Sequence, residues 1–332
     1  MSLMLADAKG VGEFLGEMNR RTFQPHDSFA VGEVFNEKEE ELPDFIGDNG
    51  YFSSIFDFAT TSWGKNDKGW YANERITPDA YKQCYFHSQK KIGDVGFYSN
   101  IIENHDEPRG VSYYIPEGDL CDESKKMLAA LYFFMRGLPF IYQGQEIGME
   151  NLGVIPIEKI DDISALDQYQ VCLDAGYTKE EALKIVSLYN RDNARTPVQW
   201  NDEKNAGFTT GIPWLMVNPN YTKINVAAQE TDENSVLAFY KKMTALRKTP
   251  EYKETFVYGD VIPFEEERHN LMAYHRKADK DVLVIGNFQR ERLTLPAEVE
   301  NILLNNYPDI KLEGKELILG GYQAVVLEMK QN

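Results

Sequence analysis

The sequence predicts an α/β protein with two parts. Apolar strand-like segments and amphipathic helices alternate through about the first 250 residues, which indicates parallel strands joined by helical crossovers. From about residue 255 the apolar period becomes two and turn residues are frequent, which is typical of short antiparallel strands. One apolar strand also ends directly in adjacent titratable side chains. A (β/α) barrel places its chemistry in this way, at the carboxyl-terminal rim of its strands.

The first quarter of the chain is predicted to contain one helix and two short strands. Apolar residues recur at helical spacing over residues 4–22, before a proline ends the pattern. Residues 29–35 and 51–59 are rich in apolar and aromatic side chains and predict buried strands. The charge run at 37–41 between them indicates a solvated helix face.

A strand, a helix and the start of another strand are predicted after this. Apolar residues from 95 to 102 predict a strand that leads into His105 and Asp106. Residues 124–136 are apolar over most of a helix surface, so we expect this helix to be largely buried. Residues 139–142 begin the next strand.

The sequence divides into two domains. Residues 1–250 are predicted to form the barrel-type part, with a long loop and helical insert at about 150–230. The insert contains two predicted helices, 160–173 and 179–189, and then a polar, aromatic loop of a length that is usually functional in a compact enzyme. Residues 251–332 are predicted to form an antiparallel β-sandwich domain.

Composition argues against several classes of function. The formal net charge is −18, so neither nucleic acid nor an anionic membrane surface is expected as a partner. The three cysteines lack paired or metal-like spacing, which predicts reduced thiols in a cytoplasmic protein. We expect no metal and no cofactor. No run reaches the roughly 18 apolar residues of a membrane helix, and the amino terminus lacks an export signal.

Three titratable residues suit the cleavage of a glycosidic bond. Retaining hydrolysis needs one carboxyl group that keeps its proton and a second that is ionised. Glu33 ends an apolar strand beside a glycine, so we expect its carboxyl to be partly buried and to favour the protonated form. Asp106 can accept hydrogen bonds from sugar hydroxyls, and His105 can donate one. Each has a plainer interpretation, Glu33 as a helix cap or ion-pair partner and the His-Asp pair as only a hydrogen bond. Their order along the chain favours the catalytic interpretation.

Longer stretches around these residues strengthen that interpretation. The sequence resembles the α-amylase superfamily, glycoside hydrolase family 13, and within it the branch of oligo-1,6-glucosidases, dextran glucosidases and trehalose-6-phosphate hydrolases. The resemblance covers essentially the whole chain, and the run 191–214 is specific to this branch. The matching stretches are Phe29–Glu33, Asn104–Arg109, Arg136–Met149, Arg191–Trp200, Asn205–Trp214 and Val217–Tyr221.

The resemblance implies roles for individual residues. Glu33 falls on the general acid/base of the family and Asp106 on its transition-state-stabilising aspartate. His105 falls on a histidine that contacts the donor sugar. The arginine that closes the donor pocket falls on Arg191, with Arg195 the less favoured choice.

Four more residues receive an expected role at or near this site. Phe35 is expected on the acceptor side of the cleaved bond or in the core, and Arg109, at the end of the His-Asp motif, is expected to bind substrate. Trp200 and Trp214 are expected to pack and hold the long loop.

One departure from the family is large. The nucleophilic aspartate of the family lies on a strand before the one that ends in Glu33, and no aspartate in residues 1–32 fits it. The chain therefore resembles the second half of a (β/α)8 barrel followed by a small antiparallel β domain. The resemblance implies an α-glucosidase acting on short α-linked gluco-oligosaccharides, inactive without a partner that supplies the amino-terminal half of the barrel.

Other functions remain as alternatives. A non-catalytic carbohydrate-binding or scaffold protein of the same family is one. Trehalose-6-phosphate hydrolysis and sucrose isomerisation are others, although the basic loop that marks sucrose isomerases is not evident in residues 110–116. Half a barrel would also leave two open sheet edges, from which we expect self-association or partial unfolding of the isolated chain.

Overall fold

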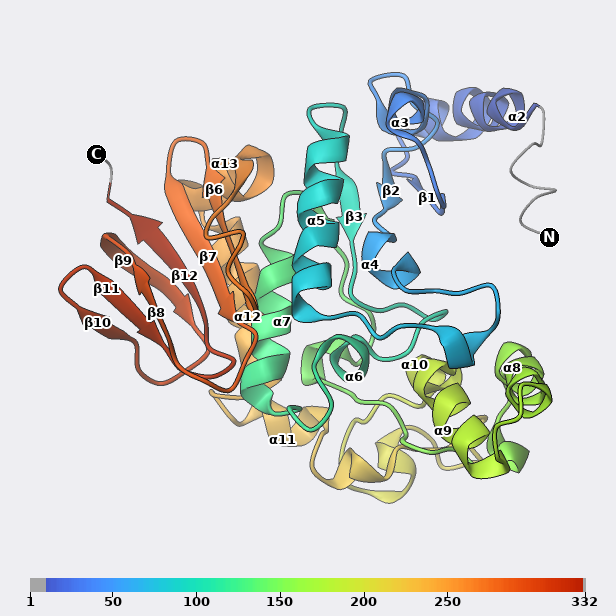
Figure 1. Cartoon of the computed structure of the whole chain (residues 1–332). Helices are drawn as coiled ribbons and strands as arrows, with labels where there is room; N and C mark the ends of the chain where they lie inside the picture. Colours follow the sequence, from blue (N-terminus) through green and yellow to red (C-terminus); the bar gives the residue numbers. More distant parts are fainter. Residues whose placement is uncertain (1–9, 331–332) are drawn as a thin grey trace.

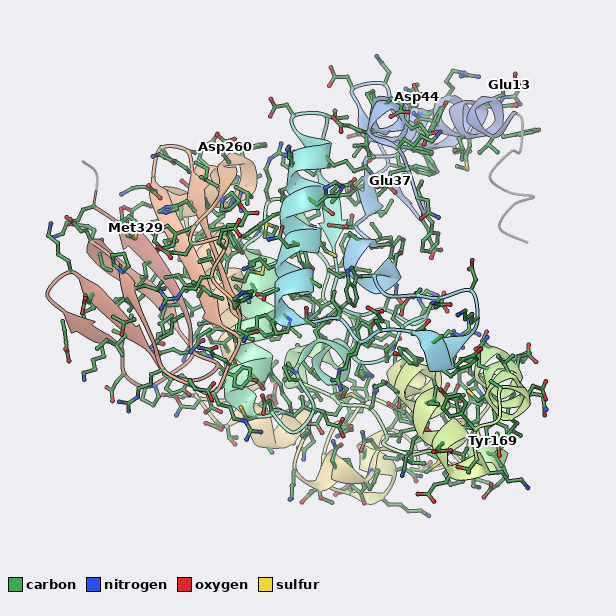
Figure 2. The ribbon with its side chains drawn as sticks, viewed as in Figure 1. Glu13, Glu37, Asp44, Tyr169, Asp260 and Met329 are labelled. Atoms are coloured by element: carbon green, nitrogen blue, oxygen red, sulfur yellow. The ribbon has the colours of Figure 1, made fainter. Side chains whose placement is uncertain are left out.

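The computed structural model describes residues 10–330 of the chain. A short parallel sheet lies beside three long helices, and a sandwich of two antiparallel sheets packs on the other side of these helices (Figure 1). A third region, built mainly of helices, extends away from both. Figure 2 places Tyr169 of this helical region and Met329 of the sandwich at opposite sides of the molecule.

The parallel sheet has four strands in the order in which they occur along the chain. They are β1 (Val31–Gly32), β2 (Ser54–Phe56), β3 (Tyr98–Asn100) and β4 (Leu138–Pro139). Each strand pairs in parallel with the next, for example Ile55 with Tyr98. Parallel neighbours that follow one another in sequence require crossover connections, as the alternating pattern predicted. The carboxyl ends of all four strands therefore meet at one edge.

The strands are shorter than the sequence predicted. Apolar runs such as 29–35 and 51–59 continue past the last paired residue into irregular backbone that is still partly buried. An apolar run indicates burial, and burial alone does not distinguish a paired strand from a buried loop. The existence and order of the strands were predicted, and their ends were not.

Three long helices form the layer between the two sheet systems. They are α5 (Pro78–Ile92), α7 (Asp122–Phe133) and α12 (Val236–Lys248). Thr77 caps α5 by accepting a bond from the Ala80 N–H at 3.2 Å, and Pro78 occupies the first turn, where no donor is needed. Most residues of α7 are buried, as its sequence indicated, because α7 lies between the parallel sheet and the sandwich.

The carboxyl-terminal part is a β sandwich. Its five-stranded sheet has the order β5 (Asp260–Pro263), β6 (Leu271–Lys277), β7 (Asp281–Asn287), β12 (Ala324–Met329) and β9 (Val299–Asn305). Its three-stranded sheet has the order β10 (Lys311–Glu313), β11 (Glu316–Leu319) and β8 (Leu293–Pro296). All pairs within both sheets are antiparallel.

The central strands of the five-stranded sheet are buried on both faces. Leu283 and Ile285 of β7 face the interior of the sandwich, whereas Val282 and Val284 pack into the core that contains α7. Gly286 continues this second face. A Cβ atom there would lie 2.7 Å from Leu131 Cδ1, so any larger residue would displace the Leu131 side chain of α7.

The predicted start of the β domain is wrong. The alternating pattern predicts strands from about residue 255 and includes Val257, but Val257 lies in helix α13 (Pro250–Tyr258), and the first strand begins at Asp260. Pro250 at the first helical position favours this helix start. A few apolar residues at even spacing were not enough to separate strand from helix.

The remaining helices and turns surround these layers. The helix predicted over 4–22 is found as α2 (Val11–Met18), followed by a π-helical turn, and its residues 4–9 lie outside the described part. No helix among residues 10–330 is long and apolar enough to cross a membrane. The other elements are η1 (Asn19–Phe23), η2 (Gln24–His26), η3 (Glu39–Glu41), α3 (Leu42–Ile46), α4 (Ala59–Ser62), η4 (Trp70–Ala72), α6 (Gly110–Tyr114), η5 (Gln145–Ile147), η6 (Ile157–Lys159), α8 (Ile163–Asp174), α9 (Lys179–Tyr189), α10 (Asp192–Arg195), η7 (Lys204–Gly207), η8 (Pro219–Thr222) and α11 (Val226–Glu230).

Candidate active site

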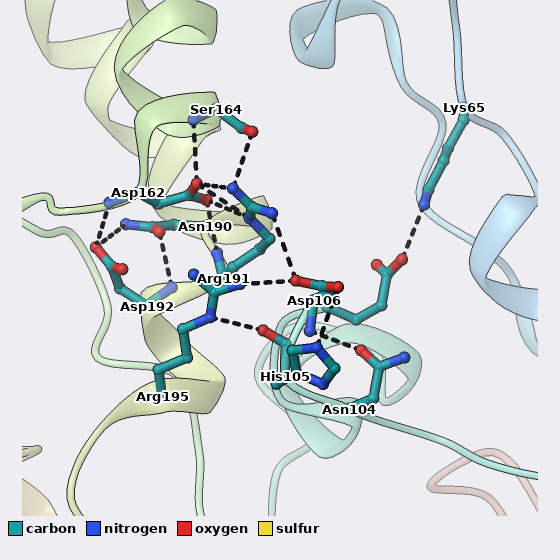
Figure 3. A network of polar contacts seen from close by, with 11 residues as sticks. Lys65, Asn104, His105, Asp106, Asp162, Ser164, Asn190, Arg191, Asp192 and Arg195 are labelled. Carbon is teal, nitrogen blue, oxygen red and sulfur yellow. Dashed lines mark hydrogen bonds and ion pairs between the residues drawn. The ribbon is translucent and has the colours of Figure 1, made fainter. Parts of the chain in front are cut away.

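The turn between β3 and α6 presents two titratable side chains. The backbone N–H of Asp106 donates to Asn104 Oδ1 at 2.8 Å, which closes the turn locally. The Asp106 side chain is 39% exposed and that of His105 is 67% exposed, so both are accessible. His105 Nε2 lies 3.3 Å from Asp106 Oδ2 (Figure 3). The turn holds a carboxylate and an imidazole side by side beyond the carboxyl end of a parallel strand.

Two arginines of the 190–195 segment reach the same carboxylate. Arg195 Nη2 donates to Asp106 Oδ1 at 2.7 Å, and Arg191 Nη1 donates to the same oxygen at 3.4 Å (Figure 3). Arg195 also donates from Nε to the carbonyl of His105 at 2.8 Å. Arg191 is the N-cap residue of α10 and Arg195 is its last residue, and this four-residue spacing places both side chains on one face. Arg195, the less favoured candidate from the sequence, makes the shorter contact.

Arg191 is itself held by a buried aspartate. Its Nε donates to both carboxylate oxygens of Asp162 at 3.0 Å, and its Nη2 donates to Asp162 Oδ1 and to Ser164 Oγ. Burial alone would raise the pKa of Asp162, but the hydrogen bonds from the Arg191 side chain and backbone outweigh it and lower that pKa. The hydrogen bond to Asp162 raises the pKa of Arg191 in turn. Both groups are therefore charged at neutral pH.

A small hollow opens beside these charged groups. Its volume is about 120 Å³, and its lining residues include Asp106, Arg191, Glu107 and Lys65 together with Trp70, Asn73, Ser164 and Tyr189. Lys65 Nζ contacts Glu107 Oε1 at 2.9 Å. Burial raises the pKa of Glu107, and the Lys65 ammonium partly offsets that rise. The hollow thus combines hydrogen-bond donors, acceptors and aromatic rings, the mixture that suits a sugar.

Glu33 differs from what the sequence led us to expect. It directly follows β1, so the parallel sheet places it at the same edge as the residues that follow β3. Its side chain is exposed, whereas partial burial was expected, because β1 lies at the end of the sheet with β2 as its sheet neighbour. Among the described contacts, Glu33 is not part of the Asp106 network. Phe35 is 54% exposed and stacks on Phe58 with ring centroids 4.4 Å apart.

Arg109 does not lie open to a substrate. Its side chain has no exposed surface, and it donates to Glu103 Oε1 at 3.0 Å and to the carbonyl of Gln143 at 2.7 Å. A third bond goes to the carbonyl of Asn193 at 3.3 Å. The prediction that Arg109 binds substrate is therefore not supported. A buried guanidinium has to satisfy its donors inside the protein, and this one ties together the segments that follow β3, β4 and α9.

The two tryptophans of the long loop also differ from the prediction. Trp200 is 51% exposed and Trp214 is 70% exposed, so neither is a packed core residue. Trp214 Nε1 donates to Asp161 Oδ2 at 3.2 Å, next to the aspartate that holds Arg191. The loop is kept in shape instead by polar contacts such as those of Asn205 with the carbonyls of Thr209 and Gly211.

The sequence did not single out Asp162, Ser164 or Lys65. A signal existed for the first two, because Asp162 is an N-cap residue whose Oδ1 accepts the Ser164 N–H at 3.0 Å at the start of α8. That signal marks a helix start and says nothing about a partner 29 positions away. Lys65 lies in an irregular segment without a motif. Among residues 10–330, no group of three or more His, Cys, Asp or Glu side chains is arranged to hold a metal ion.

A parallel sheet with carboxylate, imidazole and guanidinium groups beyond its carboxyl edge, followed by a β sandwich, defines a class of protein. It is typical of glycosidases built on a (β/α) barrel. Two family profiles match the chain: the alpha-amylase catalytic domain over residues 3–259, and the C-terminal domain of the alpha-amylase SusG over residues 271–326. The chain belongs to the alpha-amylase family, glycoside hydrolase family 13.

Individual relatives agree with this assignment. The chain is 36% identical over 282 residues to a probable oligo-1,6-glucosidase 3 of Bacillus subtilis, an alignment that covers 84% of the chain and 50% of that protein. It is 33% identical over 329 residues to an oligo-1,6-glucosidase of Bacillus cereus, covering 96% of the chain and 58% of the relative. The chain spans between half and three fifths of the length of these curated relatives.

Solved structures give the same result. The trehalose-6-phosphate hydrolase of Bacillus licheniformis matches with a TM-score of 0.88 at 32% identity, over 98% of this chain and 60% of that one. The trehalulose synthase MutB from Pseudomonas mesoacidophila matches with a TM-score of 0.89 at 31% identity, over 98% of this chain and 59% of that one. The chain thus has the fold predicted from its sequence: parallel barrel strands with an antiparallel domain behind them.

Proposed function

We propose that this chain carries part of the active site of a retaining α-glucosidase for short α-linked gluco-oligosaccharides. The observation that supports the proposal most is the cluster of Asp106, His105, Arg191 and Arg195 beside the hollow. The similarity to oligo-1,6-glucosidases supports the linkage class.

The roles follow from the chemistry of each group. Asp106 accepts hydrogen bonds from neighbouring sugar hydroxyls, and His105 donates one from its exposed ring. Arg191 closes the donor side, and the exposed face of Phe35 contacts the acceptor side. Glu33 acts as general acid and then as general base. A bound sugar would displace water from this carboxyl, which is exposed in the free chain.

Retention also needs a nucleophilic carboxylate, which neither Glu33 nor Asp106 supplies in this assignment. We propose that a further polypeptide segment contributes it. The relatives have 40% or more of their length outside the matched part, which leaves room for such a segment. The amino-terminal half of the barrel is the expected partner.

Turnover and binding are tested separately. The purified chain is expected to release no nitrophenol from p-nitrophenyl α-glucoside, and addition of the amino-terminal segment of a relative is expected to restore release. If the chain alone hydrolyses the substrate and Glu33→Gln abolishes that hydrolysis, no partner is needed.

Isothermal titration with isomaltose is expected to detect binding. Asp106→Asn should weaken that binding about tenfold, because a charge-assisted contact is lost. Asp174→Asn on α8 is the matched control and should change nothing.

A non-catalytic sugar-binding protein is the second candidate. The exposure of Glu33 outside the Asp106 network favours it, because a working acid needs an environment that retains its proton. Binding of isomaltose without turnover, even after the partner segment is added, would support this candidate over hydrolysis.

A further inference from the structure

Asp162 is a buried carboxylate at the start of α8 that faces Arg191. Its side chain has no exposed surface. It accepts bonds from Arg191 Nε at 3.0 Å, from Nη2, and from the Arg191 backbone N–H at 3.2 Å. The Nη1 atom of the same guanidinium points the other way, to Asp106 at 3.4 Å (Figure 3). One arginine therefore joins a buried carboxylate to an accessible one.

Asp162 is itself fixed by the segment that carries Arg191. The backbone N–H groups of Asp161 and Asp162 donate to Asp192 Oδ2 at 2.8 and 3.2 Å. Asn190 Nδ2 donates to the same oxygen at 3.4 Å. The loop before α8 and the segment 190–192 thus hold each other from both sides. Asp162 has little freedom to follow Arg191 if the guanidinium moves, so it acts as a fixed anchor.

An arginine side chain otherwise has many rotamers. Ordering it costs conformational entropy, and a site that must order it during binding loses affinity. Here the Nε edge is committed to Asp162 and Nη2 also reaches Ser164 Oγ at 3.0 Å. Only the Nη1 side is left facing Asp106 and the hollow. The arrangement orders the guanidinium before a ligand arrives.

We propose that Asp162 is a positioning residue that holds Arg191 with its Nη1 edge toward Asp106 and the sugar hollow. The part of this inference that concerns the sugar rests on the proposed function. The part that concerns the side chains rests on the contacts alone. Asp162 contributes to binding through Arg191 and does not itself touch the ligand.

The test uses the full chain and two neighbouring aspartates. Asp162→Asn removes the charge but leaves an asparagine, which caps a helix as well as aspartate does, so the start of α8 is retained. Asp161→Asn is the control, because it removes the same charge one residue away at a side chain bonded to Trp214. Nitrogen–proton NMR of the free chain reports the Arg191 Nε–Hε signal and the Asp106 backbone N–H.

The expected result is specific to one variant. Asp162→Asn should move or broaden the Arg191 Nε–Hε signal and shift the Asp106 backbone signal, whereas Asp161→Asn should leave both in place. In an Arg191→Ala background, Asp162→Asn should no longer affect Asp106. A shift of Asp106 that persists without Arg191, or an Arg191 signal that is the same in both single variants, overturns the proposal.

If Asp162→Asn does not fold, Ser164→Ala gives the same measurement. A smaller displacement of the Arg191 signal is then expected, and an unmoved signal counts against the proposal.

Sugar binding separates this inference from the proposed function. Asp162→Asn is expected to weaken isomaltose binding about tenfold, and to have no further effect when Arg191 is already alanine. Absence of isomaltose binding by the unaltered chain would contradict the proposed function, while the NMR comparison would still decide whether Asp162 positions Arg191. Additive losses in the double variant would show that Asp162 does not act through Arg191.

Discussion

Asp57 is a buried carboxylate directly after β2. Its Oδ1 accepts bonds from the Ala59 N–H at 3.0 Å and from Ser88 Oγ at 2.9 Å, and its Oδ2 has no hydrogen-bond partner among the described residues. Burial raises the pKa of Asp57 to about 6, and the nearby carboxylate of Glu37 adds to the rise. Ionisation of the Asp57 carboxyl therefore costs free energy in the folded state.

This predicts a pH dependence of stability. The pKa in the folded state lies above the unfolded value of about 3.9, so the protonated form favours folding. The contribution is complete below about pH 4 and is lost as the pH rises through about 6. Asp57→Asn should remove at most about 3 kcal/mol of the change in unfolding free energy between pH 4 and pH 8. Urea unfolding at several pH values measures it, and the exposed Asp44→Asn should leave the pH profile intact. A profile unchanged in Asp57→Asn would contradict the assignment.

At the scale of elements, the carboxyl end of α7 depends on arginines from other elements. Arg276 of β6 is fully buried and donates to the carbonyl of Phe134 at 2.6 Å and to that of Gly259 at 2.9 Å. Arg247 of α12 donates to the carbonyls of Phe133 and Gly137. The last carbonyls of a helix lack partners within it, and here side chains from the sandwich and from α12 supply them. The contact thereby links the two parts of the molecule.

We therefore expect Arg276→Met to destabilise the fold although it retains most of the apolar stem. The carbonyls of Phe134 and Gly259 would lose a charged donor inside the protein, with a cost of about 2–4 kcal/mol in unfolding free energy. Thermal or urea unfolding measures the loss. Arg292→Met, at an exposed arginine of the same domain, should differ from the parent by less than about 0.5 kcal/mol. Equal stability of both variants would show that the buried donor does not matter.

At the scale of the whole molecule, the parallel sheet exposes apolar side chains near its two outer strands. Phe29 is 60% exposed and Phe35 54% exposed near β1, and Phe140 and Ile141 are 36% and 41% exposed beyond β4. The strands β1 and β4 each pair with one neighbour in the sheet. Unpaired strand edges with apolar side chains beside them are templates for association.

The prediction is that the isolated chain self-associates. Light scattering after size-exclusion chromatography should show a mass that increases with micromolar protein concentration. The double variant Phe29→Ser, Phe140→Ser should reduce that increase. Ile302→Ser should not, because Ile302 lies on β9 of the sandwich and is similarly exposed, at 45%. A single monomeric species with one cooperative thermal transition would contradict the prediction.

The sequence alone determined the order of strands and helices, the change to an antiparallel domain, and the residues of the Asp106 turn. These follow from local patterns: apolar period, helix caps, and titratable groups at the end of an apolar run. It also placed Arg191 with Asp106, through resemblance to a family. It did not locate strand ends, and it took Val257 for a strand residue, because burial looks alike in strand, helix and loop.

The tertiary structure alone decided which charged side chains are exposed and which are buried. Arg109 and Arg191 are both loop arginines in the sequence, yet one is sealed among backbone carbonyls and the other faces a hollow. Glu33 is exposed where a buried acid was expected, and Asp162 is buried where only a helix cap could be inferred. The physical reason is that burial and pairing of a charge depend on segments brought together from far apart in the chain, and local sequence carries no record of those distances.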